Sequence, residues 1–238
     1  MNHDHPGLAK AKRFVKQLLG RDLWIWPQIR VETIFLGSRY GGYAICDRGL
    51  NHESIVYSFG LGEDISFDLA IIEHYRATVH AHDPTPKAMA WLQQQSLPQK
   101  FKFHPLGLAD HDGHAHFAQP RREGNVSFSI ARHPLDPQGG IMAEVARLTT
   151  LMQRNEHHHC DLLKMDVEGA EYGVLENILE TGCSIGQMVL EFHPEMIPNG
   201  LQRTRDLLKR MNREGYSIFA ISPDGRNFSL LRPQSFQS

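Results

Sequence analysis

The chain has 238 residues, of which 41% are apolar and 22% are charged, and its formal net charge is −2. A chain of this length forms one large domain, or one domain with an extension, and it can fold without disulfides or a structural metal. The nearly balanced charge argues against a dedicated nucleic-acid-binding protein, which would carry a basic surface. Histidine is frequent, with 15 residues, which raises the question of a metal site.

The three cysteines, Cys46, Cys160 and Cys183, are far apart in the sequence and form no CxxC pair. This usage predicts a reducing compartment without disulfides. Residues 1–14 lack the apolar core of a secretory signal, and no apolar run is long enough to span a membrane. We therefore expect a cytoplasmic protein.

Residues 8–19 carry apolar side chains at helical spacing with lysines between them, and Gly20 follows. The pattern predicts an amphipathic helix with a solvated basic face. Two β-rich stretches, residues 29–37 and 41–47, predict a hairpin with a glycine-rich connection.

Residues 1–50 are expected to form an N-terminal extension that packs on the core and is a candidate lid. In it, Tyr40, Gly41 and Gly42 are candidates to line an acceptor cleft. Trp24 and Trp26 are expected to be packing residues.

From residue 51 to residue 238 the chain alternates between short buried strands and helices. Strands are expected at 55–60, 78–83, 101–106, 114–119, 161–166 and 185–193, helices at 65–75, 86–95, 140–154, 170–180 and 201–215, and a terminal hairpin at 216–233. This alternation predicts an α/β fold, with a doubly wound, mostly parallel sheet covered by helices on both faces. In such sheets ligands bind beyond the carboxyl ends of the strands.

A glycine turn, Phe59-Gly60-Leu61-Gly62, follows the first core strand, and glycines let a ligand approach the backbone closely. A dinucleotide-binding turn would have a third glycine where Ile65 stands, and its pyrophosphate would meet Glu63 and Asp64. Two carboxylates disfavour a pyrophosphate and favour a positively charged ligand, such as an amino or sulfonium group. Alternatively, they only stabilise the start of the next helix.

Asp83 ends the second core strand, where a carboxylate can accept hydrogen bonds from ribose hydroxyls. Asp83-Pro84 could also be a plain turn. After the third strand, Leu108 and Ala109 could border an adenine ring. Asp110 could reach the exocyclic amine of that ring, or it could merely begin a turn.

Asp166, Glu168 and Glu171 follow the fourth core strand. Carboxylates this close together cost free energy unless solvent reaches them or a cleft uses them. Glu191 and His193 end the fifth strand, where a histidine is suited to general base chemistry near neutral pH. The alternative is a purely structural histidine.

In this order, VYSFGLGEDISFD, HAHDPTP, HPLGLAD, GNVSFSI, LLKMDVEGAEYGVLE and VLEFHP resemble the FkbM-type family of S-adenosylmethionine-dependent methyltransferases. The resemblance covers roughly residues 37–195, including GSRYGG, and the pairing of KMDVEGAE with GxGED is specific. It implies the class I methyltransferase fold, a Rossmann-like seven-stranded sheet with its last strand antiparallel. It also implies methyl transfer, commonly to an oxygen.

The resemblance further implies that Gly60, Gly62 and Glu63 contact the methionine part of S-adenosylmethionine and that Asp166 lies near its amino group and methyl. Ser58 departs from the general pattern, in which an acidic residue is common, so Glu63 or Asp64 would supply the negative charge. The expected cofactor-binding residues are Ser58, Phe59, Gly60, Leu61, Gly62, Glu63, Asp64, Asp83, Pro84, Leu108, Ala109, Asp110 and Asp166.

For a hydroxyl acceptor, the protein must supply position and a base. We expect His193 to take the proton, with Glu191 or Asp166 orienting it. Alternatively, Asp166, Glu191 and His193 hold a divalent cation, such as magnesium or manganese, that positions a diol. Residues 124–129 are either an acceptor-side or cofactor-side loop or a plain surface connection.

The expected acceptor is a small molecule or a saccharide. Two other functions stay open, a nicotinamide-dependent oxidoreductase and a non-catalytic cofactor-binding protein on the same fold. Of the 15 histidines, His193 is the one expected to act. His157-His158-His159, for example, has no cysteine or carboxylate partners at zinc spacing.

Overall fold

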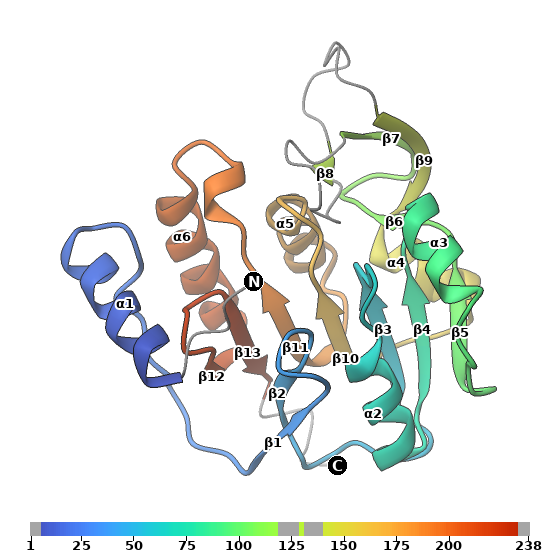
Figure 1. Ribbon diagram of the computed structural model, residues 1–238, viewed down its shortest axis with the longest axis horizontal. Coiled ribbons are helices and arrows are strands. Elements are labelled where there is room, and N and C mark those ends of the chain that lie inside the picture. Colours follow the sequence, from blue (N-terminus) through green and yellow to red (C-terminus); the bar gives the residue numbers. More distant parts are fainter. Residues whose placement is uncertain (1–5, 119–128, 131–139, 233–238) are drawn as a thin grey trace.

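The computed structural model describes residues 6–118, 129–130 and 140–232 (Figure 1). Its central sheet has seven strands in the order β12-β13-β11-β10-β3-β4-β5. The strands are β3 (Ile55–Phe59), β4 (Thr78–His82), β5 (Phe101–His104), β10 (Cys160–Met165), β11 (Ile185–Glu191), β12 (Ser217–Ile221) and β13 (Asn227–Leu231). The last strand, β13, is antiparallel to both of its neighbours, whereas β11, β10, β3, β4 and β5 pair in parallel. The expected doubly wound, mostly parallel sheet is therefore confirmed.

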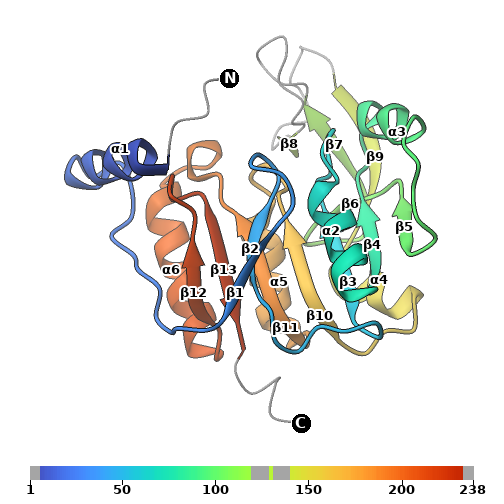
Figure 2. The same cartoon turned by 60° about the horizontal axis from the view of Figure 1, so that its bottom comes forward.

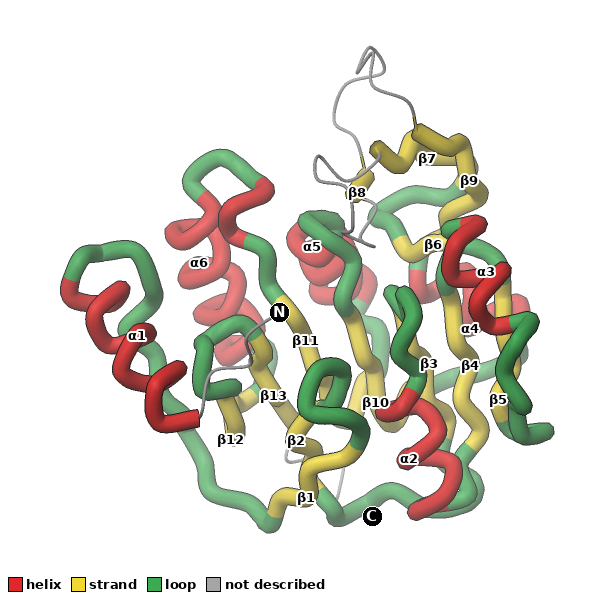
Figure 3. Tube along the Cα trace, viewed as in Figure 1, coloured by secondary structure: helices red, strands yellow, loops and turns green. Residues whose placement is uncertain are grey.

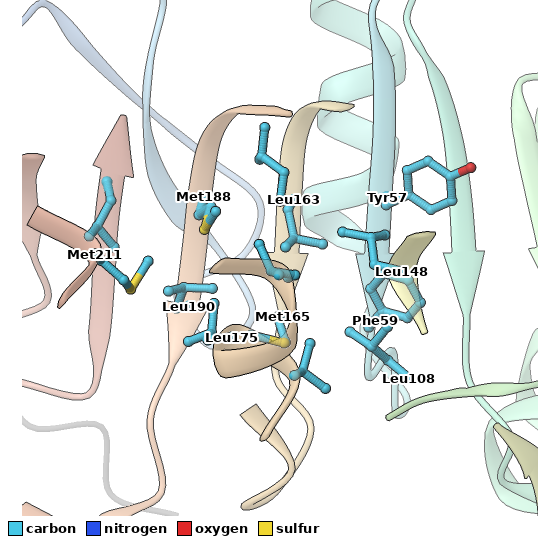
Figure 4. Packing of buried hydrophobic residues seen from close by; sticks show 14 of the residues in the cluster. Tyr57, Phe59, Leu108, Leu148, Leu163, Met165, Leu175, Met188, Leu190 and Met211 are labelled. Atoms are coloured by element: carbon cyan, nitrogen blue, oxygen red, sulfur yellow. The ribbon is translucent and has the colours of Figure 1, made fainter. Parts of the chain in front are cut away.

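Helices cover both faces of this sheet (Figures 1 and 2). One face carries α4 (Leu148–Arg154), α5 (Glu171–Thr181) and α6 (Gly200–Arg213), and a short 3₁₀ helix, η1 (Pro194–Met196), precedes α6. The other carries α2 (Ser66–Tyr75), α3 (Pro86–Leu92) and the hairpin of β1 (Thr33–Leu36) and β2 (Tyr43–Cys46). Figure 4 shows the hydrophobic core on the α5 face of the sheet, in which Leu163 and Met165 of β10 meet Leu175 of α5.

Local sequence explains where these helices begin and end. Thr85 caps α3, because its side chain accepts a hydrogen bond from the backbone N–H of Ala88, and Pro86 occupies the first turn. Gly182 ends α5 in the left-handed conformation, at φ +64°. Short loops then return the chain to the sheet, which is why the alternating pattern is so regular.

Two buried polar side chains fasten the β1–β2 hairpin to the sheet. The Gln187 side chain of β11 accepts a hydrogen bond from the Cys46 N–H (3.0 Å) and donates one to the Cys46 carbonyl (3.2 Å). The Ser229 hydroxyl of β13 donates to the Ala44 carbonyl at 2.7 Å. The predicted hairpin is thus confirmed, and it lies across β11 and β13 with its backbone groups satisfied.

The predicted helix over residues 140–154 is wrong in its first half. Residues Gly140–Ala146 form β9, which joins β6 (Gly107–Leu108), β7 (Gly113–Ala118) and β8 (Ser129–Ile130) in a second, four-stranded sheet. Along β9, Ile141 and Ala143 are shielded while their neighbours are exposed, so the period is two and not that of a helix. Antiparallel pairing with β7 overrides the helix preference of Met142 and Glu144.

α1 (Pro6–Leu18) stands on the outer side of the molecule beside α6, where Figure 3 shows a long loop joining it to β1. The packing expected of Trp24 and Trp26 is confined to the surface, because they are 44% and 62% exposed and contact each other and Phe14. No helix in the described part of the chain is long and apolar enough to cross a membrane.

Candidate active site

The order of strands reverses between β3 and β10, so a crevice is expected beyond the carboxyl ends of these two strands. The glycine turn after β3 meets the chain after β10 there. The Asp166 N–H donates to the Phe59 carbonyl at 3.2 Å. A Cβ on Gly60, which has φ +75°, would lie 1.7 Å from the Asp166 carbonyl oxygen. Only glycine permits this approach, which places the first residue of the acidic segment against the turn.

Asp83 organises the glycine turn from the end of β4. Its Oδ2 accepts hydrogen bonds from the N–H groups of Leu61 and Gly62, both at 3.0 Å. Its Oδ1 accepts from the N–H and the hydroxyl of Thr85, at 2.9 and 2.6 Å. These donors fill the roughly four acceptor sites of a carboxylate, so a ribose hydroxyl would have to share Asp83 with the turn.

Glu63 and Asp64, the two carboxylates of the turn, both have partners within the protein. Glu63 is exposed and pairs with Lys87 of α3 at 3.1 Å. Asp64 accepts hydrogen bonds from the Ser38 hydroxyl at 2.6 Å and from the Ser66 N–H at 2.8 Å. Burial acts to raise the pKa of Asp64, but these hydrogen bonds outweigh it and the pKa is lowered.

Ser38 and Asp64 bring the GSRYGG segment onto the glycine turn. The Ser38 hydroxyl also accepts from the N–H groups of Tyr40 and Gly41. A Cβ on Gly41 would lie 2.7 Å from Asp64 Oδ2, so a small residue is needed for this docking. Burial raises the pKa of Tyr40, and the charges of Asp166 and other carboxylates add to this. The N-terminal hairpin therefore borders the site.

Sequence reasoning missed Lys164, which is buried in β10 beside Ser58 of β3. Its ammonium group donates to the carbonyls of Phe59 and Gly60. It also acts on Asp68 of α2, whose pKa burial raises and the lysine charge lowers. A lysine between apolar residues of a central strand was the available signal, because an unpaired buried charge is costly. Lys164 therefore stabilises the glycine turn through hydrogen bonds to its backbone carbonyls.

His193 is 3% exposed and lies among four carboxylates. The closest is Glu171 of α5, which is fully buried. Its Oε1 accepts from the His193 N–H at 2.7 Å and lies 3.3 Å from Nδ1, and its Oε2 accepts from the Gly169 N–H at 2.7 Å. Asp166 and Glu168 each lie 3.6 Å from His193 Nε2. Asp166 and Glu191 are the neighbours that the sequence predicted for His193, and the tertiary structure adds Glu168 and Glu171.

These neighbours shift the titration of His193 and Glu191 strongly. Burial acts to lower the pKa of His193, but the hydrogen bond to Glu171 and the charge of Asp166 raise it to about 9. Burial raises the pKa of Glu191 to about 7, with a further contribution from Asp166. His193 is therefore an imidazolium near neutral pH, and it compensates the surrounding carboxylates.

The same cluster offers ligands to a metal ion. In the described part of the chain, one atom each from Asp166, Glu168 and His193 lie within 4.8 Å of one another. The set expected from the sequence had Glu191 in place of Glu168. Glu191 Oε1 is 3.9 Å from His193 Nε2, and Arg226 lies 3.8 Å from it on the other side. Carboxylate and imidazole ligands suit magnesium or manganese.

The residues expected near adenine lie in and after β6, next to the chain that follows β4. Leu108 and Ala109 are each 2% exposed, and Leu108 belongs to the core. Pro84 packs on the backbone at Gly107, because a Cβ there would lie 3.3 Å from its ring. Asp110 pairs with the exposed His111 and lies against α5. The chain after β4 and the chain at β6 are thus neighbours.

Residues 124–128 of the segment considered as a loop near the site lie outside the described residues, and Ser129 begins β8.

A seven-stranded sheet in this order, with a glycine turn and carboxylates at its switch point, is a Rossmann-like doubly wound domain, the architecture that the resemblance to methyltransferases implies. The family model of the Methyltransferase FkbM domain matches residues 50–218. The chain therefore belongs to the FkbM methyltransferase family.

Two curated relatives carry the name "Probable methyltransferase-like protein 24". The protein from Rattus norvegicus is 25% identical over 88% of this chain and 52% of its own length. The protein from Homo sapiens is 26% identical over 78% of this chain and 46% of its own length. The chain thus spans about half the length of these relatives.

Among solved structures, Methyltransferase FkbM from Methylobacillus flagellatus KT aligns with a TM-score of 0.46 and 14% identity, over 76% of this chain and 44% of its own. The fibrillarin pre-rRNA processing protein of Methanococcus jannaschii aligns with a TM-score of 0.42 and 10% identity, over 76% and 67%.

Proposed function

We propose that this chain transfers a methyl group from S-adenosylmethionine to a hydroxyl of a small molecule or saccharide. The observation that carries the proposal is the close contact of the glycine turn with Asp166, which brings backbone N–H groups and carboxylates together at the switch point. Among the described residues, no donor lies within hydrogen-bond distance of the buried Asp166 Oδ1, and His193 Nε2 is 3.6 Å away, as expected for an atom that accepts from a ligand. Family membership supports the same reaction.

Negative charge at this edge suits a ligand with an ammonium group and a sulfonium sulfur. Glu63 and Asp64 have partners at 3.1 Å or closer, whereas Asp166 lies 3.6 Å from His193 Nε2, so Asp166 is the carboxylate we assign to these positive groups. The turn from Ser58 to Gly62, which Asp83 and Lys164 hold in place, would bind the rest of the S-adenosylmethionine molecule. When bound, S-adenosylmethionine would supply the methyl group from a sulfonium leaving group.

His193 and Glu191 are the two candidate bases for the acceptor hydroxyl. Glu171 fixes Nδ1 of His193 and leaves Nε2 towards the other carboxylates. The pKa of His193, about 9, should fall towards neutrality when a positive charge binds beside the same carboxylates. We assign proton removal to His193, with Glu171 as its positioning residue. Tyr40 is assigned to the acceptor side.

Calorimetry with S-adenosylmethionine tests the cofactor assignment. Asp166→Asn should raise the dissociation constant at least about ten-fold, which corresponds to about 1.4 kcal/mol. Glu53→Gln, an exposed change at the opposite edge, is the matched control and should bind as the wild type does. Binding of NAD in place of S-adenosylmethionine would contradict the proposal and favour an oxidoreductase. Binding without turnover on any hydroxyl acceptor would favour a non-catalytic protein.

Turnover separates the two bases. With His193 as the base, His193→Ala should bind the cofactor at least as tightly as the wild type but lose methyl transfer, and the wild-type rate should rise with pH until the imidazole is neutral. A His193→Ala enzyme with wild-type turnover would refute this role. A rate that levels off near pH 7 and is lost in Glu191→Gln would move the role to Glu191.

A divalent cation on Asp166, Glu168 and His193 is a second candidate, favoured by the convergence of their ligand atoms. The ion would replace the proton of His193 and orient an acceptor with neighbouring hydroxyls. Activity that disappears after treatment with a chelator and returns with magnesium or manganese would support the ion. Unchanged activity after that treatment would remove it.

A further inference from the structure

Exposed apolar side chains are concentrated on α1 and the segment that follows it. Among the described residues, twelve large apolar side chains are strongly exposed, and seven of these lie between residues 8 and 26. Single exposed apolar residues are ordinary, but a continuous group marks an interaction surface. We name this group the α1 patch; it consists of Leu8, Phe14, Val15, Leu18, Leu19, Trp24 and Trp26.

α1 is turned so that its polar side faces the protein. The Gln17 side chain is buried and donates to the Leu23 carbonyl at 2.7 Å. Arg13 is shielded and pairs with Asp22 at 3.6 Å, and a Cβ on Gly225 would lie 2.5 Å from Arg13 Nε. A surface helix normally buries its apolar stripe and exposes its polar side. In α1 the apolar side chains are exposed, and Arg13 and Gln17 face the protein in their place.

The aromatic members of the α1 patch are held in place on the outside. The Phe14 and Trp24 rings contact each other edge to face at 5.9 Å, and the Trp24 and Trp26 rings are 5.8 Å apart. The Trp24 indole N–H donates to the Gln17 carbonyl at 3.1 Å. The three rings therefore form one connected group that stays at the surface.

Basic side chains accompany this apolar surface. Residues 7–26 contain five lysines and arginines and one acidic residue, although the whole chain is net negative. The acidic residue, Asp22, is paired with Arg13, and the lysines, such as Lys10 and Lys16, are exposed. In a symmetric contact between two copies these lysines would approach each other, whereas a negatively charged surface would attract them.

We propose that the α1 patch and its lysines dock the protein on an anionic lipid bilayer. The apolar side chains would enter the boundary between headgroups and acyl chains, and the lysines would reach the lipid phosphates. The β12–β13 turn, which packs on Arg13, also carries Arg226, which pairs with Glu191 and Glu195. Docking would hold the carboxyl edge of the sheet near the bilayer. This inference does not depend on the proposed reaction.

Flotation of the full chain with vesicles is the test. We expect binding to phosphatidylcholine vesicles that contain phosphatidylglycerol, weak binding to phosphatidylcholine alone, and loss of binding at high salt. Tryptophan fluorescence should shift to shorter wavelength on binding, in a Trp91→Phe background that leaves only Trp24 and Trp26.

Two pairs of variants separate the apolar and the charged parts. Leu18→Asp should abolish flotation, whereas Leu97→Asp, an exposed leucine elsewhere, should float as the wild type does. Lys16→Glu should lower the partition coefficient at least about five-fold, and Lys209→Glu on α6 should leave it unchanged.

Three outcomes would overturn the proposal. One is equal binding to both kinds of vesicle, and another is equal loss in each variant and its control. The third is a dimer in light scattering that Leu18→Asp dissociates, which would assign the α1 patch to a second copy.

Discussion

Two buried histidines of this protein are in opposite electrostatic states. His193 and His82 are 3% and 1% exposed, so burial alone should keep both neutral. Four carboxylates surround His193; burial acts to lower its pKa, but Glu171, Asp166 and Glu168 raise it to about 9. Burial and the neighbouring imidazoles of His104 and His80 lower the pKa of His82 to about 2.

His82 belongs to a stack of rings on the α4 side of the sheet. It lies 4.7 Å from Phe59 and 4.5 Å from His104, measured between ring centroids, and neither of its nitrogens has a hydrogen-bond partner among the described residues. His80 stacks on Tyr57 in the same way at 5.2 Å. Here imidazole serves as a flat neutral ring, whereas at His193 it serves as a cation. The neighbouring groups, and not the depth of burial, therefore decide whether a buried histidine of this protein is neutral or charged.

The largest expected effect is at His193. His193→Gln should lower the free energy of unfolding at pH 7 by about 3 kcal/mol, because it leaves buried carboxylates without a compensating charge. Urea denaturation measures this change. His158→Gln, an exposed histidine in the chain before β10, is the matched control. Equal stability of both variants would mean that His193 is not charged in the folded protein.

The opposite result is expected at His82. His82→Phe keeps a stacked ring and removes two unsatisfied nitrogens, so it should stabilise the protein. At pH 5 the gain should be about 2 kcal/mol, because the unfolded wild type binds a proton that the folded form excludes. Thermal or urea unfolding at pH 5 and pH 8 checks both statements. A loss of stability at pH 5 would show that His82 has a partner there.

The wild-type pH profile should show both environments. The lowered pKa values of His80, about 4, and His82, about 2, mean that stability falls as the pH drops below about 6.5, where the unfolded chain gains protons. The raised pKa of His193 means that its stabilisation is complete below about 6.5 and is lost as the pH rises through about 9. The loss in the free energy of unfolding on the acid side, and the loss on the alkaline side, should each amount to about 1–3 kcal/mol in urea denaturation. A profile that is flat from pH 5 to 9 would contradict both assignments.

The smallest effect is expected at the edge of the ring stack. The Tyr57 hydroxyl lies 2.8 Å from His157 Nδ1 and accepts from the Asn155 side chain at 3.0 Å. Tyr57→Phe should therefore cost about 1 kcal/mol in thermal unfolding and leave cofactor binding unchanged. An unchanged melting temperature would show that stacking alone holds these rings.

The alternating pattern predicted most of the central sheet, because parallel strands buried on both faces are short, apolar and bounded by turns. The same reasoning failed at residues 140–146, where helix-forming side chains such as Met142 and Glu144 belong to a strand. Only the antiparallel partner β7 makes the extended form favourable there. Local preference is worth fractions of a kcal/mol per residue, and pairing outweighs it.

The candidate site was likewise predicted only in part from local sequence. Position at the end of a strand was sufficient to select Gly60, Asp166 and His193, because the carboxyl ends of parallel strands share one edge. It could not select the partners of each group. Lys164 beneath the turn and Ser38 on Asp64 come from distant parts of the chain.

The sequence by itself determined the alternation of strands and helices and the family motifs that follow the strands, because both depend on short-range periodicity and spacing. Tertiary structure alone decided which carboxylates have partners, which histidines are charged and which side of α1 faces outward. Those properties depend on burial and on charges brought together from remote segments, and no local pattern encodes them. The 15 histidines show the difference, since one composition contains both a buried cation and a neutral ring stack.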